Sequence, residues 1–330
     1  MGIKKELLKL FGSGRSNKAA KGKIAFAAEM EAVRAGKSAY KAHLQSGVSH
    51  SPLLRRNIHR LEKGLCFPDG KRTFAEKYIT ETVTAFSVAL KADTHDPLEL
   101  QWAKDVLTRY FDRVEKTAPI IADAYALFLS GHDAYAGSSS PFPFKQITPV
   151  EGINGESFLR LCQNRVSCRW FTDQKLSRLQ IEQAVNSASQ AASACNRQPF
   201  QFLLIENAEL KKQVVNLPFG TAGFGEDLPH LMMVLGDLSN FALERDRHLI
   251  YIDSALATAQ LMLSFTAQGF ASVPINWPDV EENHSTARKL LGLENYHVPI
   301  MLVGFGCPDP EAMIPFSQKK SPHSLMKVYD

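Results

Sequence analysis

Hydrophobic residues are patterned in two different ways along this chain of 330 residues. Residues 17–135 place apolar side chains three and four positions apart, which is typical of amphipathic helices. After residue 155, helical patterns alternate with short, continuous apolar runs of the kind found in a sheet covered on both faces. The change predicts an all-α amino-terminal domain followed by an α+β or α/β domain, in which helices flank a central sheet.

The two patterns meet in a segment of different composition. Residues 135–155 are rich in Gly, Ser and Pro, and we place the linker there. The expected organisation is a basic tail over residues 1–23, a helical domain over 24–150 and a sheet domain over 151–330. Asp96 and Pro97 look like a helix start, because Asp caps helices and Pro fits their first turn.

The expected elements follow from these periodicities. In the first half, helices are expected over 18–35, 51–64, 73–92 and 97–116. In the second half, helices are expected over 156–164, 177–192, 208–215, 249–269 and 284–291. The expected strands are 200–206, 231–236, 271–275 and 298–305.

Charge is concentrated at the amino terminus. The formal net charge is +4, of which residues 1–23 contribute +6, so the remaining residues sum to −2. Such a tail suits peripheral contact with an anionic membrane surface, or it is a solvated terminus, and both readings stay open. The apolar stretch Leu249–Pro274 contains Asp253 and is expected to be a buried helix. These features favour a cytoplasmic protein, with the inner face of the membrane as the alternative location.

Several classes of site have no support in the sequence. The five cysteines form no C-x-x-C pair, which indicates reduced thiols and predicts no metal site. Basic residues outside the tail are balanced by acidic ones, and no aromatic and basic platform suggests nucleic acid. A Gly-x-Gly-x-x-Gly motif is absent, so no dedicated nicotinamide fold is expected.

Three polar segments in the second half carry the functional prediction. In the first, Arg165, Ser167 and Arg169 alternate, so an extended chain would present them on one face to an anion such as phosphate. The alternative is a solvated strand with exposed arginines. The second segment places Asn196 and Gln198 between a helix and an apolar strand, where their amides could match the edge of a heterocycle.

For the second segment the alternative is a capped loop whose amides bond the backbone. The third segment, 269–277, follows a long apolar helix that would end at Gly269. A short strand leads from it to Pro274, Ile275, Asn276 and Trp277. Taken alone, this third segment is an ordinary connection between a helix and a strand.

Together the segments resemble the nitroreductase family, over about residues 156–330. Its opening Arg-x-Ser-x-Arg/Lys-x-Phe motif matches Arg165, Ser167, Arg169 and Phe171. Its Ser-x-x-Asn-x-Gln-Pro-Trp motif matches Ser193, Asn196, Gln198 and Pro199, with Phe200 in place of Trp. Its long helix with an early Asp matches a helix that contains Asp253, and its Val-Pro-Ile-Glu-Gly strand end becomes Val273-Pro274-Ile275-Asn276-Trp277. The end of the chain, Lys319-Lys320-Ser321-Pro322, is similar to the basic segment near the family's phosphate site.

The resemblance implies FMN bound at a homodimer interface, with both subunits lining each pocket. Arg165, Ser167 and Lys320 would hold the phosphate, and Arg169 would face the ribityl chain and the N1–C2 edge of the flavin. Asn196 and Arg197 would bond the pyrimidine edge, and backbone N–H groups near Asn276 and Trp277 would face N5 and O4. The implied cofactor residues are Arg165, Ser167, Arg169, Asn196, Arg197, Gln198, Pro274, Ile275, Asn276, Trp277, Lys319 and Lys320.

The implied activity is hydride transfer from transiently bound NAD(P)H through flavin N5 to a small-molecule acceptor. The cofactor carries this chemistry, so no catalytic side chain is named. One alternative is a non-catalytic flavin-binding or membrane-associated interaction protein, which Trp277 would favour if it filled the substrate face. Another keeps the flavin but oxidises a specific sugar or lipid intermediate.

The amino-terminal half has a basic helix of its own. Arg56, Arg60 and Lys63 share one face of the run Leu53–Leu65, which would suit a phosphate or sulfate group. A solvated helix face is the alternative. The run resembles a helical extension of some nitroreductase-like proteins encoded near polysaccharide-assembly functions.

Overall fold

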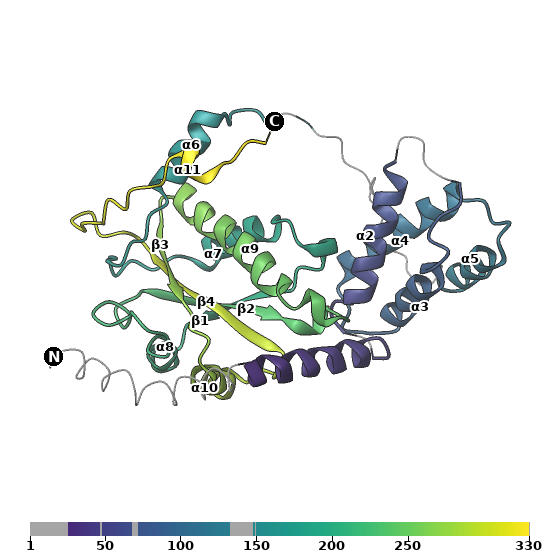
Figure 1. Cartoon of the computed structure of the whole chain (residues 1–330), viewed down its shortest axis with the longest axis horizontal. Helices are drawn as coiled ribbons and strands as arrows, with labels where there is room; N and C mark the ends of the chain where they lie inside the picture. The colour runs from purple at the N-terminus through teal and green to yellow at the C-terminus, as the bar shows by residue number, and fades with distance from the viewer. Residues whose placement is uncertain (1–25, 47, 68–71, 133–147, 149, 330) are drawn as a thin grey trace, which may run out of the picture.

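The structure is a computed structural model that describes residues 26–329, apart from 47, 68–71, 133–147 and 149. The basic tail and most of the expected linker therefore lie outside the described residues. In the described part, helices come first and a mixed helix and strand region follows, as the sequence predicts (Figure 1). The protein is thus α+β, with an all-helical region before a sheet flanked by helices.

Four helices build the amino-terminal domain: α2 (Pro52–Leu65), α3 (Ile79–Leu90), α4 (Pro97–Arg113) and α5 (Pro119–His132). Ser51 caps α2 by accepting a hydrogen bond from the Leu54 amide, and Asp96 caps α4 as predicted. The α3 helix begins later than expected, because Ala75 has a left-handed φ of 67° that breaks the helical path before Tyr78. The apolar faces of these helices meet in one core around Ile58, Phe86 and Phe111.

An antiparallel sheet forms the centre of the second domain. Its strands are β1 (Phe200–Ile205), β2 (His230–Asp237), β3 (Ala271–Asn276) and β4 (His297–Gly306), in the order β1-β2-β4-β3. All four were expected from the sequence to within a residue or two. Phe200 pairs with Gly236 at one end of the sheet, and Ser272 pairs with Phe305 at the other.

Helices cover both faces of this sheet, which explains the continuous apolar strands. On one face, α7 (Arg178–Ser189) and α9 (Leu249–Ala267) pack on Met232, Val234 and Val303. On the other face, the core contains residues of α8 (Ala208–Val215) and α10 (Glu281–Leu291), such as Val214 and Ala287, packed with strand residues. The segment Glu244–Ala267, which includes α9, is long and apolar enough to cross a membrane by length and composition, but seven α9 residues are buried here.

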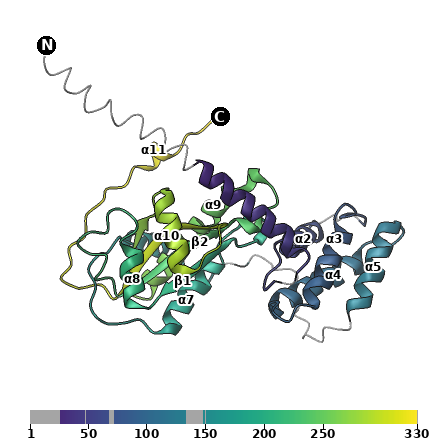
Figure 2. The ribbon, with the colours of Figure 1, turned by 90° about the horizontal axis from the view of Figure 1, so that it is seen from below.

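A helix over residues 26–43 joins the two domains (Figure 2). Its Val33 packs with Leu238, Phe241 and Ile250 of the sheet domain. Gly36 allows the close approach, because a Cβ there would lie 2.7 Å from the Cβ of Leu238. Part of the expected helical domain is therefore packed on the sheet domain, and the limit at residue 150 stays a prediction.

Apolar side chains remain exposed along one side of the sheet domain. On α9, Ile252 and Leu256 are 54% and 46% exposed. The short helix α6 (Gly155–Asn164) buries none of its residues, although Phe158 and Leu159 are apolar. After β4 the chain continues through α11 (Pro322–Leu325), and in this last segment Phe316 is 92% exposed.

Candidate functional site

The segment that contains Arg165, Ser167 and Arg169 is extended, as predicted. Ser167 forms a parallel bridge with Ser272 at the start of β3, and the Cys168 amide donates to the Ser272 carbonyl over 3.1 Å. Cys168 is buried, and burial raises the pKa of its thiol, so it is a packing residue. Because side chains alternate along an extended chain, Ser167 and Arg169 point to the side opposite Cys168.

The guanidinium groups of Arg165 and Arg169 form no ion pair with any described residue. The guanidinium of Arg165 has no hydrogen bond or ion pair there, and the guanidinium of Arg169 lies only over the ring of Phe224, at 5.5 Å. The hydroxyl of Ser272, on the residue paired with Ser167, is buried and also lacks a partner among the described residues. A buried, unpartnered hydroxyl beside unpartnered arginines is a donor set that suits an anion.

The second segment forms a strained loop between α7 and β1. Cys195, Asn196 and Gln198 have φ values of 55°, 53° and 52°, in the left-handed region that non-glycine residues rarely adopt. The Ala194 amide, which begins the turn, donates to the carboxylate of Asp253 on α9 over 3.0 Å. The early Asp of the long helix therefore acts as a support for this loop.

The polar side chains of the loop differ in their surroundings. The amide of Gln198 is occupied, because its Nε2 donates to the Ser189 carbonyl and its Oε1 accepts from Arg55. Asn196 is partly exposed, and no described residue bonds its side chain. Arg197 is only 9% exposed, and its Nε has no partner among the described residues. Burial lowers the pKa of Arg197, and its guanidinium lies 5.0 Å from the ring centroid of Phe241.

The third segment places its two unusual residues on different sides. Asn276 ends β3 and is exposed, whereas Trp277 turns into the core beside Ile275 and Ala287. The ring of Trp277 meets that of His284 edge to face, with centroids 6.1 Å apart. Trp277 is therefore a core residue, and its indole does not stand over the outer face of β3. Lys319 and Lys320 are exposed, and no described residue pairs with them.

The sheet separates the first segment from the second. Ser167 lies beside the β3 edge at the end marked by Ser272 and Phe305, whereas loop 194–198 leads into the β1 edge at the end marked by Phe200 and Gly236. Four strand spacings across, from Ser167 beyond β3 to β1, and six residues along β2, from His230 to Gly236, put these corners roughly 25–30 Å apart. One chain thus brings Arg165, Ser167 and Arg169 together at one corner and Asn196, Arg197 and Gln198 together at the other.

A cleft of about 530 Å³ lies beside loop 194–198, between the two domains. Arg197, Gln198 and Phe200 line it from the sheet domain, while His50 and Arg55 line it from the helical domain. The sequence patterns did not point to Arg55 as a site residue. One feature of the sequence could have indicated Arg55: it directly follows leucines that are buried in α2. A charged side chain next to buried residues needs a partner.

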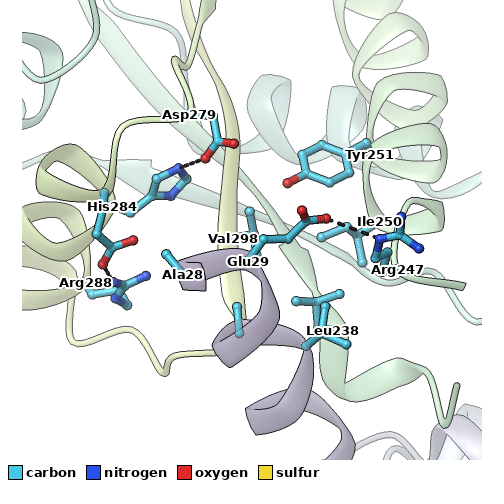
Figure 3. Close-up of a pocket in the computed structure, with 13 residues that line it drawn as sticks. Ala28, Glu29, Leu238, Arg247, Ile250, Tyr251, Asp279, His284, Arg288 and Val298 are labelled. Atoms are coloured by element: carbon cyan, nitrogen blue, oxygen red, sulfur yellow. Dashed lines mark hydrogen bonds and ion pairs between the residues drawn. The ribbon is translucent and has the colours of Figure 1, made fainter. Parts of the chain in front are cut away.

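A smaller cavity of about 40 Å³ lies between helix 26–43 and the helices α9 and α10 (Figure 3). Polar contacts frame it: Arg247 forms an ion pair with Glu29 at 3.4 Å, and Nε2 of His284 lies 3.3 Å from the carboxylate of Asp279. The room is enough for roughly one or two water molecules. This cavity is a small gap in the packing between these helices and is too small for a cofactor.

The basic helix face of α2 is partly used inside its own domain. The guanidinium of Arg60 lies 3.6 Å from the ring centroid of Tyr78, and His59 pairs with Glu62. Trp102 also donates its indole N–H to Glu62 over 2.6 Å. Of the three basic residues of this face, these contacts engage Arg60, so a structural role and an anion site both stay predictions for Arg56 and Lys63.

Comparison with known proteins shows what the second domain is similar to. Residues 162–226 and 211–307 match the model of the nitroreductase family. An Archaeoglobus fulgidus protein, provisionally named an NADH dehydrogenase/NAD(P)H nitroreductase, is 27% identical over 157 residues, which cover 47% of this chain and 88% of the relative. An iodotyrosine deiodinase of Haliscomenobacter hydrossis is 22% identical and covers 57% of this chain and 96% of the relative.

Solved structures of similar proteins align with part of this chain. A nitroreductase family protein of Streptococcus pneumoniae aligns with a TM-score of 0.46 and 20% identity, over 52% of this chain and all of that one (100%). An FMN-dependent nitroreductase of Clostridium difficile aligns with a TM-score of 0.43 and 15% identity, over 52% of this chain and 98% of that one. Each likeness spans about half of this chain.

Proposed function

Because the carboxy-terminal half of this chain is a nitroreductase-family domain, we propose that the protein is a homodimeric, FMN-dependent oxidoreductase that uses NAD(P)H. The observation that carries the proposal is the unpartnered donor set at the β3 corner, formed by Arg165, Ser167 and the buried hydroxyl of Ser272. These groups fit the phosphate of FMN in charge and in hydrogen-bonding capacity. Lys319 and Lys320, which are exposed and unpaired within the described residues, would complete this phosphate site.

The remaining predicted contacts divide between the two corners. Arg169 belongs to the β3 corner and would line the ribityl chain, whereas Pro274, Ile275 and Asn276 lie further along β3, towards its end at the Asn276–Met301 pair, and would line the flavin ring. Asn196 and Arg197 belong to the β1 corner and would bond the pyrimidine edge. FMN itself would supply the redox chemistry, taking hydride from NAD(P)H at N5 and passing electrons to the acceptor.

We propose that each flavin site takes its β3 corner from one subunit and loop 194–198 from the partner. The two corners lie far apart in one chain, and a two-fold dimer can bring opposite corners of two copies together. Exposed apolar residues suit such an interface: Ile252 and Leu256 of α9, Phe158 of α6, and Phe316 of the last segment. Light scattering at micromolar concentration should give a dimer, and a monomer with stoichiometric FMN would refute the shared site.

A mixing experiment tests the divided site directly. Homodimers of Arg165→Ala and of Asn196→Ala should both bind FMN poorly, since every site carries one defect. Co-expression of the two variants should restore about one site in four, because half of the dimers are mixed and each mixed dimer has one intact site. If each corner served a site within its own chain, no site would recover.

The decisive test of the cofactor is the spectrum of the purified protein. Flavin absorbance that bleaches on addition of NAD(P)H, with FMN identified by mass after acid release, is the expected result. A colourless protein that fails to take up added FMN would rule the proposal out. Trp277 would have favoured the non-catalytic alternative if it filled the substrate face, but that residue is packed in the core.

The chemistry of the flavin suits several classes of electron acceptor. A quinone or a nitro compound would suit as the acceptor of a flavin that reacts by hydride transfer. In the alternative, the flavin oxidises a sugar or lipid intermediate, which is then the electron donor. A cytoplasmic location, with membrane contact through residues 1–23, stays a prediction because those residues lie outside the described part.

A further inference from the structure

Arg55 of α2 reaches from the helical domain into the sheet domain. Its Nε donates to the backbone carbonyl of Asn196 over 3.0 Å, and its Nη2 donates to Oε1 of Gln198 over 3.3 Å. The side chain of Arg55 is only 13% exposed, and its guanidinium lies 5.3 Å from the ring centroid of Trp102. One planar group therefore bonds two residues of the strained loop at once.

A buried carboxylate fixes the guanidinium from behind. Glu99 of α4 accepts from Nη1 of Arg55 over 2.9 Å, and it also accepts from the Ser51 amide over 2.9 Å. His50 and His95 lie 2.9 Å and 3.1 Å from the same carboxylate. Burial alone would raise the pKa of Glu99, but hydrogen bonds from His50 and His95 and the charge of Arg55 hold it well below its usual range. The carboxylate is thus a fixed anion that orients Arg55.

The loop needs such an external support. Cys195, Asn196 and Gln198 all have left-handed φ values, and conformations of this kind persist only where surrounding contacts hold them. The described contacts come from three directions: Asp253 of α9 on the Ala194 amide, Ser189 on the Gln198 side chain, and Arg55 on both Asn196 and Gln198. Ser193, within the turn, accepts from the amides of both Asn196 and Gln198, and Arg55 reaches the same two residues from the helical domain.

We infer that Arg55 is a positioning residue for the flavin, and that the helical domain acts on the redox site through the Arg55 contact with loop 194–198. The inference rests on the proposed function for its flavin part. By holding the Asn196 carbonyl, Arg55 sets where the Asn196 side chain and the buried Arg197 guanidinium can meet the pyrimidine edge. The helical domain is then a working part of the flavin site.

Amide hydrogen exchange of the flavin-free, full-length protein tests the support itself. Arg55→Ala should speed exchange of the amides of residues 196–200 by about tenfold or more, because a charged hydrogen-bond donor across the loop is lost. The matched control is Arg113→Ala, since Arg113 bonds the Leu65 and Phe67 carbonyls inside the helical domain and touches no part of the loop. Unchanged exchange in the loop, or faster exchange spread evenly over α2–α5, would overturn the inference.

The flavin readout is measured on the same variants. Arg55→Ala should weaken FMN binding about tenfold and shift the midpoint potential of the bound flavin, while Arg113→Ala should leave both unchanged. Arg55→Lys should recover little, because an ammonium cannot bond the carbonyl, the amide and the carboxylate in one plane. Normal affinity and potential in Arg55→Ala would overturn the positioning role. A wild-type protein without FMN would defeat the proposed function, and the exchange result would still decide whether Arg55 supports the loop.

Discussion

Two regions of the molecule hold arginines in opposite conditions. At the β1 corner, Arg55 donates to Glu99, Asn196 and Gln198, and all of these partners belong to the chain itself. At the β3 corner, Arg165 has no partner among the described residues, and Arg169 lies only against an aromatic ring. Both corners carry residues that the sequence connects with one cofactor.

The difference separates charges that build the site from charges that would bind a ligand. A guanidinium whose donors are met by buried acceptors stabilises a particular backbone shape, and its removal leaves a buried carboxylate uncompensated. A guanidinium without protein partners has its hydrogen-bonding capacity free for an anion. The first kind of residue should therefore affect stability, and the second should affect cofactor affinity.

The largest effect is expected at the carboxylate behind Arg55. Glu99→Gln should lower the free energy of unfolding at pH 7 by about 3–5 kcal/mol, because it breaks a buried charge network. The pKa of Glu99 is depressed in the folded state, so its stabilisation is present above the unfolded pKa of about 4.5 and is lost as the pH falls below that value. Urea unfolding between pH 3 and pH 7 should show that the free energy of unfolding of the wild type falls at low pH. The fall should be smaller in the variant.

The control for this prediction is Glu115→Gln. Glu115 is 51% exposed and lies 3.8 Å from Arg72, so its substitution should change the free energy of unfolding by less than about 1 kcal/mol. Equal effects of the two substitutions would contradict the view that the Arg55 network is structural.

The next effect is expected on affinity at the β3 corner. Arg165→Ala should weaken FMN binding by about 10- to 100-fold, since a charge-assisted bond to phosphate contributes about 1.5–3 kcal/mol. The matched control is Arg178→Ala, because Arg178 already pairs with Glu206 on the surface at 2.7 Å. Fluorescence titration of both variants measures the difference, and equal affinities would make Arg165 an ordinary surface residue.

Most of the fold could be predicted because its periodicities are strong. All four strands and most of the helices lie close to their expected positions, since continuous apolar runs and caps such as Asp96 are local signals. The late start of α3 could not be predicted, because it depends on the left-handed φ of Ala75. The docking of helix 26–43 on Leu238 also depends on contacts far apart in the sequence.

The sequence motifs of the site could be predicted, but the positions of these motifs relative to one another in space could not. The motifs around Arg165 and Asn196 are local and visible, whereas their placement at opposite corners follows from the strand order β1-β2-β4-β3. Arg55 is 141 residues from Asn196, and no periodicity connects them. The inward turn of Trp277 likewise depends on space offered by His284 and Ala287 of α10.

A smaller effect is expected on the pH dependence of the sheet domain. His230 at the start of β2 accepts a hydrogen bond from the Leu176 amide over 2.9 Å and stacks on Phe305, so it must be neutral. Burial, with the charges of Lys175 and Lys211, lowers the pKa of His230 from 6.5 to about 4. The unfolded state therefore binds more protons between these values, and the free energy of unfolding falls as the pH drops from 6.5 towards 4.

Because His230 is half-buried, we expect this loss to be about 1–2 kcal/mol after solvent screening. Thermal unfolding of the wild type across pH 4–7 should show it. His230→Asn keeps a hydrogen-bond acceptor without the titration, so its melting temperature should depend less on pH. An identical pH profile in the variant would assign the acid sensitivity to other groups, with Glu99 the first to test.

The smallest effect is expected at Trp277, the residue that departs most from the family pattern. Trp277 is packed against Ile275 and Ala287, and its indole N–H is buried without a partner among the described residues. Trp277→Phe removes some packing volume, which costs stability, but it also removes the unsatisfied donor. The two effects oppose each other, so the free energy of unfolding should change by less than about 1 kcal/mol. FMN affinity should stay within about twofold, because the ring faces the core and not the ligand side of β3. A large change in affinity or in the flavin spectrum would place Trp277 against the cofactor, and the division between structural and ligand-binding residues would then fail at this position.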